Sequence, residues 1–322
     1  MAFISIVSGT FNEEDNVEEL YERVKRVFQE RLPDDSYEMI VIDNASTDGT
    51  VAVLKRLAAN DVRLKIIVNN RNFGHIRSPV HAILQARGDA VVAIASDLQD
   101  PPELIPELVA KWREGYSIVA GVKPKSLETP LMWVVRRLYY RVIGAIADVD
   151  LVQNFTGFGL YDGSVIEAIR KLDDPYPYFR GIISELGFRV AQLPYTQHPR
   201  VRGITKNNFY TLYDLAMLGI TSHSKVPIRL ATMAGFALSL LSLAISFTYL
   251  VLKLMFWEYF GFGTAPILIG LFFFSSVQLF FIGLLGEYVA SIHTQVLKRP
   301  LVVERERVNF DNVQDSGGGT QR

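Results

Sequence analysis

The sequence predicts a doubly wound α/β domain, built on a mostly parallel sheet and followed by two membrane-spanning helices. Up to about residue 120, short β-rich apolar runs alternate with segments whose apolar positions recur every three or four residues. Such alternation is typical of βαβ units, whose right-handed crossovers produce a parallel sheet with helices on both faces. Beyond residue 225, two long uncharged stretches replace this pattern and predict the helical pair.

The run at residues 90–95 is the clearest strand of the sheet and ends at a cluster of polar residues. Six apolar residues without alternation fit a strand that is buried on both faces. Asp97, Gln99 and Asp100 follow it, and the prolines after them cannot continue the ladder. Ligands bind outside the carboxyl ends of strands in such sheets, so these acids are candidates for a metal or a polar substrate. Alternatively, the acids only turn the chain into the helix that starts at Pro102.

The other elements of the domain follow the same rules. Strands are expected at 3–8, 38–42, 64–68 and 117–120, and helices at 17–28, 51–59, 76–86 and 102–114. In a parallel sheet the loops 9–13, 43–48 and 97–100 fall at one edge, which favours a binding site over turn chemistry. No G-x-G-x-x-G follows the first strand and no P-loop motif is present, so dinucleotide binding and P-loop hydrolysis are disfavoured.

The composition excludes several classes of function. The chain contains no cysteine, which rules out disulfides, thiolate catalysis and cysteine-based zinc sites. Its formal net charge of −1 argues against general nucleic-acid binding.

Between the sheet and the uncharged stretches, the pattern predicts segments that lie on a membrane surface. Residues 128–148 place arginines beside an apolar, aromatic face, as in a helix lying in a membrane interface; a core helix with snorkelling arginines is the alternative. Residues 207–223 predict a second amphipathic helix. The basic set Arg200, Arg202 and Lys206 suits phosphate; a plain basic loop beside anionic lipid is the alternative, and the two are compatible. Further elements are expected as a strand or loop at 154–161, a helix at 179–186 and a strand at 188–193.

The two uncharged stretches, 230–252 and 262–286, are long enough to span a bilayer. The first would measure roughly 34 Å as a helix, against a hydrocarbon core of about 30 Å. Basic residues flank the pair, whereas only Lys253 is basic between them, so we expect both termini and the sheet in the cytoplasm. A soluble helical hairpin is the weaker alternative. The expected division is 1–225 for the sheet domain with its two amphipathic helices, 226–290 for the hairpin and 291–322 for a tail that is disordered from Asn309.

A family resemblance rests on the order and spacing of five segments together with the paired spans. The segments are Thr10–Glu14, Asp43–Thr50, Asn70–Gly74, Ser96–Glu103 and Arg200–Lys206. In this order they resemble the inverting glycosyltransferases of family 2 that load a sugar onto a polyprenyl phosphate, the group of dolichyl-phosphate mannose synthase and bactoprenol glucosyltransferase. The resemblance covers most of the chain.

The resemblance implies a GT-A fold, a nucleotide-sugar donor over the carboxyl edge of the sheet, and Mg²⁺ or Mn²⁺ on the donor pyrophosphate. By the same resemblance, Asp97 and Gln99 lie near the metal, and Arg200, Arg202 and Lys206 lie near the acceptor phosphate. Asp97 and these three basic residues are the expected catalytic residues. Glu13, Asp43 and Asn44 are expected near the nucleoside of the donor. The full set of residues expected to bind the donor is Thr10, Phe11, Glu13, Asp43, Asn44, Arg71, Ser96 and Asp97.

At two positions this sequence lacks an acid that the family usually has. Ala95 stands where the family usually has the first aspartate of Asp-x-Asp-x-Gln, but Mg²⁺ needs few protein carboxylates when it also binds substrate phosphates. Phe158 stands where a Thr-Gly-Asp-Phe type segment has its acid, so either Asp162 substitutes or no acid is needed. The second option is reasonable because a phosphate monoester, with a second pKa of about 6, is already largely dianionic at neutral pH.

The expected partners are a UDP-sugar, for example UDP-glucose, undecaprenyl or another polyprenyl phosphate, and the bilayer of a bacterial-type inner membrane. A homo-oligomer and a GDP-mannose donor remain open. A processive polysaccharide synthase is a rival, although neither Gln-x-x-Arg-Trp nor further spans are present. A non-catalytic sugar-nucleotide sensor or scaffold is a rival of another class, suggested by Ala95 and Phe158.

Overall fold

The computed structural model describes residues 1–123, 155–197, 217–218, 226–256 and 264–310. The expected helices at 128–148 and 207–223 and the basic residues Arg200, Arg202 and Lys206 lie outside these ranges, apart from the two helical residues 217–218. Those predictions therefore stay predictions.

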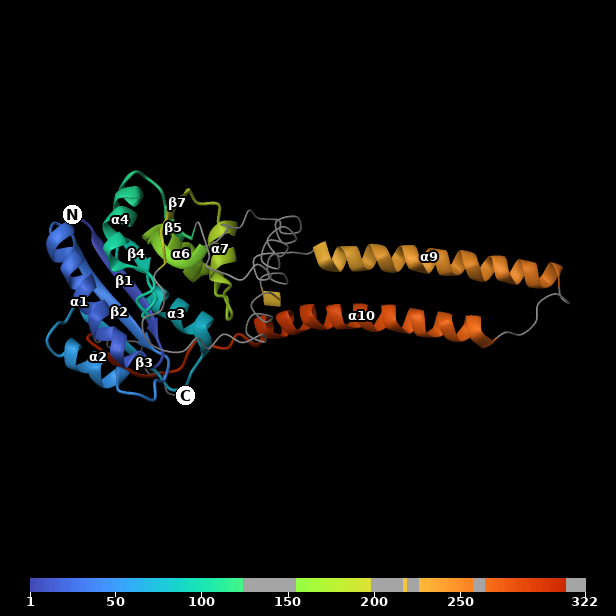
Figure 1. Ribbon diagram of the computed structural model, residues 1–322, viewed down its shortest axis with the longest axis horizontal. Coiled ribbons are helices and arrows are strands. Elements are labelled where there is room, and N and C mark those ends of the chain that lie inside the picture. The colour runs from blue at the N-terminus through green and yellow to red at the C-terminus, as the bar shows by residue number, and fades with distance from the viewer. Residues whose placement is uncertain (124–154, 198–216, 219–225, 257–263, 311–322) are drawn as a thin grey trace, which may run out of the picture. The chain divides into compact units, whose positions relative to one another are not determined.

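The described chain contains an eight-stranded sheet with the strand order β7-β5-β6-β4-β1-β2-β3-β8 (Figure 1). Its elements in chain order are β1 (Phe3–Thr10), α1 (Glu14–Arg31), β2 (Ser36–Asp43), α2 (Thr50–Ala58), β3 (Leu64–Asn69), α3 (Gly74–Gln85), β4 (Ala90–Ala93), the 3₁₀ turn η1 (Pro102–Leu104), α4 (Ile105–Arg113), β5 (Ile118–Val122), β6 (Phe155–Asp162), α6 (Gly163–Leu172), α7 (Phe179–Glu185), β7 (Val190–Pro194) and β8 (Glu304–Val308).

The predicted parallel sheet is confirmed for its central strands. β4, β1, β2 and β3 are parallel neighbours, so their carboxyl ends share one edge. β6 is antiparallel to both β4 and β5, which makes the sheet mixed. β4 ends at Ala93, two residues earlier than expected, yet the Ile94 amide still donates to the carbonyl of Val7 at 2.9 Å.

Helices cover both faces of the sheet, as the unbroken apolar run of β4 requires. One face packs against α1, α2 and α4, and the other against α3, α6 and α7. Ile4 and Ile6 of β1 are fully buried on the first face, and Ile40 and Ile42 of β2 are fully buried on the second. Because apolar side chains fill both faces, only the strand ends are open to polar chemistry.

Two elements were not expected. The first, α6, begins at its N-cap Asp162, whose carboxylate accepts from the amide of Ser164. The second, β8, pairs antiparallel with β3 and brings the chain back to the sheet after the helical pair. Charged residues dominate β8, so it lacks the apolar signal of a strand. Asn309, predicted to start a disordered tail, instead donates to the carbonyls of Ala58 at 2.8 Å and Leu64 at 2.9 Å.

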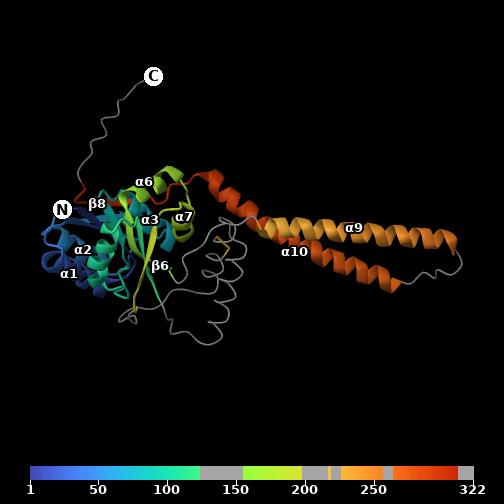
Figure 2. The ribbon, with the colours of Figure 1, turned by 90° about the horizontal axis from the view of Figure 1, so that it is seen from above.

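The helical pair consists of α9 (Val226–Met255) and α10 (Thr264–Leu297), which lie next to each other (Figure 1 and Figure 2). Both are longer than the predicted spans, because hydrogen-bonded helix continues beyond the uncharged stretches. By length and composition both can cross a membrane, and no residue of either apolar window is buried. The described residues after Leu297 belong to the same compact unit as the sheet, whereas α9 and α10 form a separate unit.

Candidate active site at the carboxyl edge of the sheet

The loops after β1 and β2 are tied together by hydrogen bonds. The Asn12 amide donates to Oγ of Ser46 at 2.9 Å, and the Thr47 amide donates to Oδ1 of Asn12 at 2.8 Å. The amide of Asn44 donates to the carbonyl of Thr10 at 2.9 Å. The predicted convergence of these loops is therefore confirmed.

Two further loops join them at the same edge. Oγ of Ser96, in the loop after β4, donates to the carbonyl of Gly9 at 3.0 Å. Asn44 reaches the loop after β3: its Nδ2 donates to Oδ1 of Asn72 at 2.9 Å, and its Oδ1 accepts from the Phe73 amide at 2.8 Å. The side chain of buried Asn44 thus links the loop after β2 to the loop after β3.

Each of the three predicted site loops contains one non-glycine residue in the left-handed region of backbone space. These residues are Asn12 with φ 56°, Ala45 with φ 63° and Leu98 with φ 59°. Asparagine tolerates this conformation, but for alanine and leucine it costs on the order of 1 kcal/mol or more. Such strain persists where the surrounding contacts impose it, and it commonly accompanies functional sites.

Several buried polar atoms at this edge have no hydrogen-bond partner within the described residues. They are Oγ of Ser8, Oγ1 of Thr10 and Oδ1 of Asp43. The other oxygen of Asp43 accepts from the Ser46 amide at 2.9 Å. Burial raises the pKa of Asp43, although the bonds from Ser46 oppose the rise. An unpaired buried acceptor costs about 1–3 kcal/mol, so this edge favours a ligand that carries hydrogen-bond donors.

Asp97 is the accessible carboxylate of the loop after β4. It is half-buried, and its Oδ1 accepts from the Gln99 amide at 3.2 Å. Within the described ranges no three acids or histidines cluster as a complete metal site. Asp97 with the half-buried Gln99 instead fits a hard cation that takes most of its oxygen ligands from water and from substrate phosphates.

Asp100 has a different role, because other side chains enclose it. It is 4% exposed, and its Oδ1 accepts from the Tyr195 hydroxyl and from Nε2 of Gln197, the latter at 3.3 Å. Burial and the nearby carboxylate of Asp97 raise the pKa of Asp100, while the bond from Tyr195 opposes the rise. Asp100 therefore connects the Asp97 loop to residues 195–197, which directly precede the basic segment that contains Arg200.

The structure describes both Phe158, which stands at the position of the missing acid, and Asp162, its possible substitute. Phe158 is 2% exposed and packs edge-on against Tyr195, with ring centroids 5.3 Å apart. Asp162 pairs with Ala90 at the amino end of β4 and accepts from Nε1 of Trp112 at 2.7 Å. It lies at the opposite end of the strand from Asp97, so it does not substitute for the missing acid.

Some of the other residues predicted to bind the nucleotide sugar make contacts with neighbouring residues. Oε2 of Glu13 accepts from Nδ2 of Asn16 at 2.6 Å, at the start of α1. The Arg71 guanidinium stacks on Phe73, 4.2 Å from the ring centroid. Phe11 is half-buried at the end of β1.

A family model described as glycosyl transferase family 2 matches residues 5–167. An uncharacterized glycosyltransferase of Bacillus subtilis is 33% identical over 96% of this chain and 95% of its own length. An uncharacterized glycosyltransferase of Synechocystis is 36% identical over 92% and 93%. A prophage-derived bactoprenol glucosyl transferase of Shigella flexneri is 34% identical over 92% and 96%.

Among solved structures, the chain is similar to glucosyl-3-phosphoglycerate synthase from Mycobacterium tuberculosis. The TM-score is 0.47 and the sequence identity 20%, with 68% of this chain and 76% of that chain covered.

Proposed function

Because the chain belongs to glycosyltransferase family 2, we propose that it transfers one sugar from a nucleotide sugar to a membrane polyprenyl phosphate. Relatives named bactoprenol glucosyl transferase support the acceptor, since they match this chain over nearly its whole length. The observation that carries the proposal is the edge itself, where four loops meet around unpaired buried oxygens and the half-buried carboxylate of Asp97.

The donor is a UDP-hexose, for which UDP-glucose is the first candidate. The unpaired oxygens of Ser8, Thr10 and Asp43 suit a nucleoside, which offers N–H and O–H donors. The predicted set Thr10, Phe11, Glu13, Asp43, Asn44, Arg71 and Ser96 would line this part of the site. A GDP-mannose donor is the alternative.

Asp97 and Gln99 would hold Mg²⁺ or Mn²⁺, which would screen the donor pyrophosphate and stabilise the charge that develops on the departing nucleotide. Asp97 itself would orient the pyrophosphate relative to the acceptor. Asp100 is a positioning residue, because its bonds to Tyr195 and Gln197 link this loop to the segment before Arg200.

The acceptor phosphate would attack the anomeric carbon without a general base. With a second pKa of about 6 it is largely dianionic at neutral pH. Neither Phe158 nor Asp162 supplies a carboxylate at this edge. Arg200, Arg202 and Lys206 would bind the acceptor phosphate and align it for attack.

α9 and α10 would anchor the enzyme in a bacterial inner membrane with the sheet domain in the cytoplasm. The pairing of β8 with β3 supports this topology, because a chain that crosses twice returns to the side from which it started. Both described ends of the chain would then be cytoplasmic. A homo-oligomer is compatible with this arrangement.

The test is incubation of the full-length protein with a panel of labelled nucleotide sugars, Mg²⁺ or Mn²⁺, and polyprenyl phosphate. A monosaccharide-lipid product is expected, and the donor that gives it identifies the sugar. A polymer would instead indicate a processive synthase, and donor binding without any product would indicate a sensor.

Lys206→Ala tests the acceptor assignment within the same assay. Transfer should fall while UDP binding stays near normal, since Lys206 is assigned to the acceptor alone. Equal loss of both would contradict the assignment.

A further inference from the structure

A cluster of three arginines lies beside the loop after β3. The guanidiniums of Arg71 and Arg77 share the ring of Phe73, at 4.2 Å and 5.5 Å from its centroid. Arg77 also donates through Nη2 to the carbonyl of Pro300, which places Arg299 next to the same group. We call Arg71, Arg77 and Arg299 the arginine cluster.

The arginine cluster lacks a counter-charge within the described part of the chain. No carboxylate there lies within ion-pair distance of any of its three guanidiniums, and Nε of Arg77 is buried without a hydrogen-bond partner. Burial and the guanidiniums of Arg71 and Arg299 lower the pKa of Arg77, as expected for like charges held together. Such an arrangement favours an anion.

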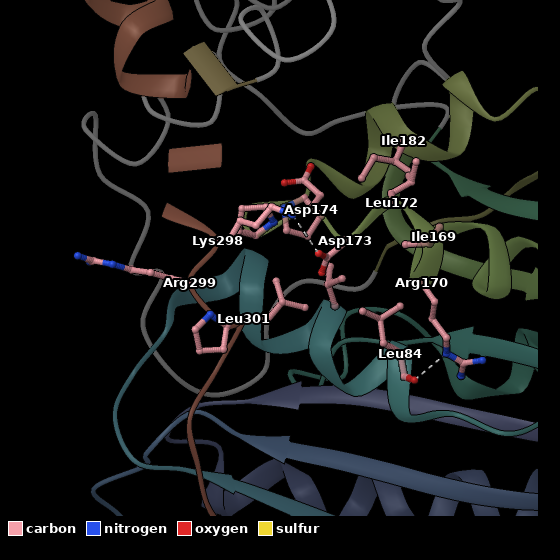
Figure 3. Close-up of a pocket in the computed structure, with 14 residues that line it drawn as sticks. Leu84, Ile169, Arg170, Leu172, Asp173, Asp174, Ile182, Lys298, Arg299 and Leu301 are labelled. Atoms are coloured by element: carbon pink, nitrogen blue, oxygen red, sulfur yellow. Dashed lines mark hydrogen bonds and ion pairs between the residues drawn. The ribbon is translucent and has the colours of Figure 1, made fainter. Parts of the chain in front are cut away.

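The nearby acids line a cavity and one of them pairs with Lys298. A cavity of about 140 Å³ lies between α3, α6 and residues 298–301 (Figure 3). Asp173 and Asp174 line it, and Nζ of Lys298 lies 3.9 Å from the carboxylate of Asp173. Lys298 and Arg299 both line the cavity, and the guanidinium end of Arg299 extends outward from it in Figure 3.

The order of strands separates the arginine cluster from the proposed sugar-transfer chemistry. Arg71 follows β3, whereas Asp97 follows β4, and β1 and β2 lie between these strands. The loop of Asp97, where the pyrophosphate is proposed to lie, is therefore separated by two strands from the loop that contains Arg71. Arg71 is also one of the residues proposed to line the donor site, whereas Arg77 and Arg299 are not. In contrast, Arg299 is only two residues beyond Leu297, the last residue of α10, and is exposed.

We propose that the arginine cluster binds the phosphate of an anionic phospholipid headgroup where the chain leaves the membrane helix α10. The proposal rests on the membrane anchoring proposed above. Guanidinium groups pair with phosphate oxygens through forked hydrogen bonds, and basic residues next to a membrane helix are drawn to anionic lipid.

The test measures binding of phosphatidylglycerol to the full-length protein in mild detergent by native mass spectrometry, without donor or acceptor. Arg77→Gln and Arg299→Gln should each weaken binding about fivefold, since one basic residue near anionic lipid contributes about 1 kcal/mol. Arg305→Gln is the matched control: Arg305 is exposed on β8 but lies outside the arginine cluster, and its loss should change binding less than twofold.

Three outcomes would overturn the proposal. Unchanged binding in Arg299→Gln is the first, and this exposed substitution does not depend on a buried contact. Equal loss in Arg305→Gln is the second, because it would indicate diffuse charge rather than a site. Displacement of phosphatidylglycerol by equimolar polyprenyl phosphate is the third, since it would assign the arginine cluster to the acceptor. Because no sugar transfer is measured, failure of the proposed activity would leave this result unaffected.

Discussion

The two edges of the sheet use polar residues in opposite ways. At the carboxyl edge, Ala45 and Leu98 adopt a strained backbone and buried oxygens of Thr10 and Asp43 lack partners. At the amino edge, acids are bound by several donors. Glu38, for example, accepts from Oγ of Ser5 at 2.5 Å and lies 2.7 Å from Nζ of Lys65.

Other acids toward the amino edge also accept hydrogen bonds from groups within the fold. Asp89 accepts from the Phe3 amide at 2.8 Å, and Asp35 accepts from the Ala2 amide at 2.9 Å and from Arg113 at 2.7 Å. Asp162 caps α6 and accepts from Trp112. The acids at the amino edge are therefore held by donors of the fold, although Oη of Tyr37 there is buried without a hydrogen-bond partner among the described residues. At the carboxyl edge, Thr10 and Asp43 have unpaired oxygens and the carboxylate of Asp97 is half-buried, so polar groups remain available for a ligand.

The sharpest test of this contrast uses the two aspartates at opposite ends of β4. Asp97→Asn should lower sugar transfer by about a thousandfold, equivalent to about 4 kcal/mol, because the proposed metal loses its carboxylate. Asp162→Asn should leave transfer within twofold, since asparagine remains a good N-cap. Initial rates with saturating donor and acceptor measure both. Comparable losses in the two variants would remove the distinction between the edges.

Glu38→Gln tests the structural role of the amino edge. It keeps an acceptor for Ser5 but leaves the Lys65 ammonium, whose side chain is 16% exposed, without its counter-ion. Removing one partner of a buried ion pair is strongly destabilising, so we expect a loss of about 3 kcal/mol. Denaturant unfolding of the full chain in detergent measures it. The KM for the donor should stay unchanged, and a raised KM would mean that the amino edge also serves the site.

The pairing of strand β8 with the sheet is expected to depend on pH through Glu304. Burial alone would raise the pKa of Glu304, but hydrogen bonds from His81 and Arg307 bring it down to about 2. A carboxylate with a depressed pKa stabilises the fold above its unfolded value near 4.3, and this contribution is lost as the pH falls toward 2. The protection factors of the β8 amides, which correct for the slower intrinsic exchange in acid, should therefore fall as the pH drops from about 4.3 toward 2.

Glu304→Gln provides the control for this acid effect. The amide cannot titrate, so this loss of protection on acidification should disappear in the variant. An identical pH profile for the variant and the parent chain would show that another group controls the docking of β8.

The smallest expected effect concerns backbone strain. Ala45→Gly should raise stability by about 0.5–1 kcal/mol, because glycine adopts φ 63° without steric cost. Ala52→Gly, at an exposed position inside α2, should lower stability by a similar amount. Unfolding midpoints of the two variants should move in opposite directions. A loss of stability in both would mean that Ala45 is not strained.

Local patterns in the chain determined much of this protein. The unbroken apolar run of β4 required burial on both faces, and the alternation of strands and helices required parallel crossovers. Together these two constraints place the loops of Thr10, Asp43 and Asp97 at one edge before any coordinates are known. The long uncharged stretches likewise predicted α9 and α10, because helix length and charge are local properties.

Only the tertiary structure decided which polar residues act together. Nothing near Asp162 in the chain shows that antiparallel β6 carries it to the amino edge, away from Asp97. The strand β8 is charged and depends on partners such as Lys55, whose Nζ lies 2.6 Å from Glu306 although 251 residues separate them. The periodicity of apolar residues indicates how one segment is buried. Pairing between distant segments depends on the packing of the whole fold and produces no pattern within either segment.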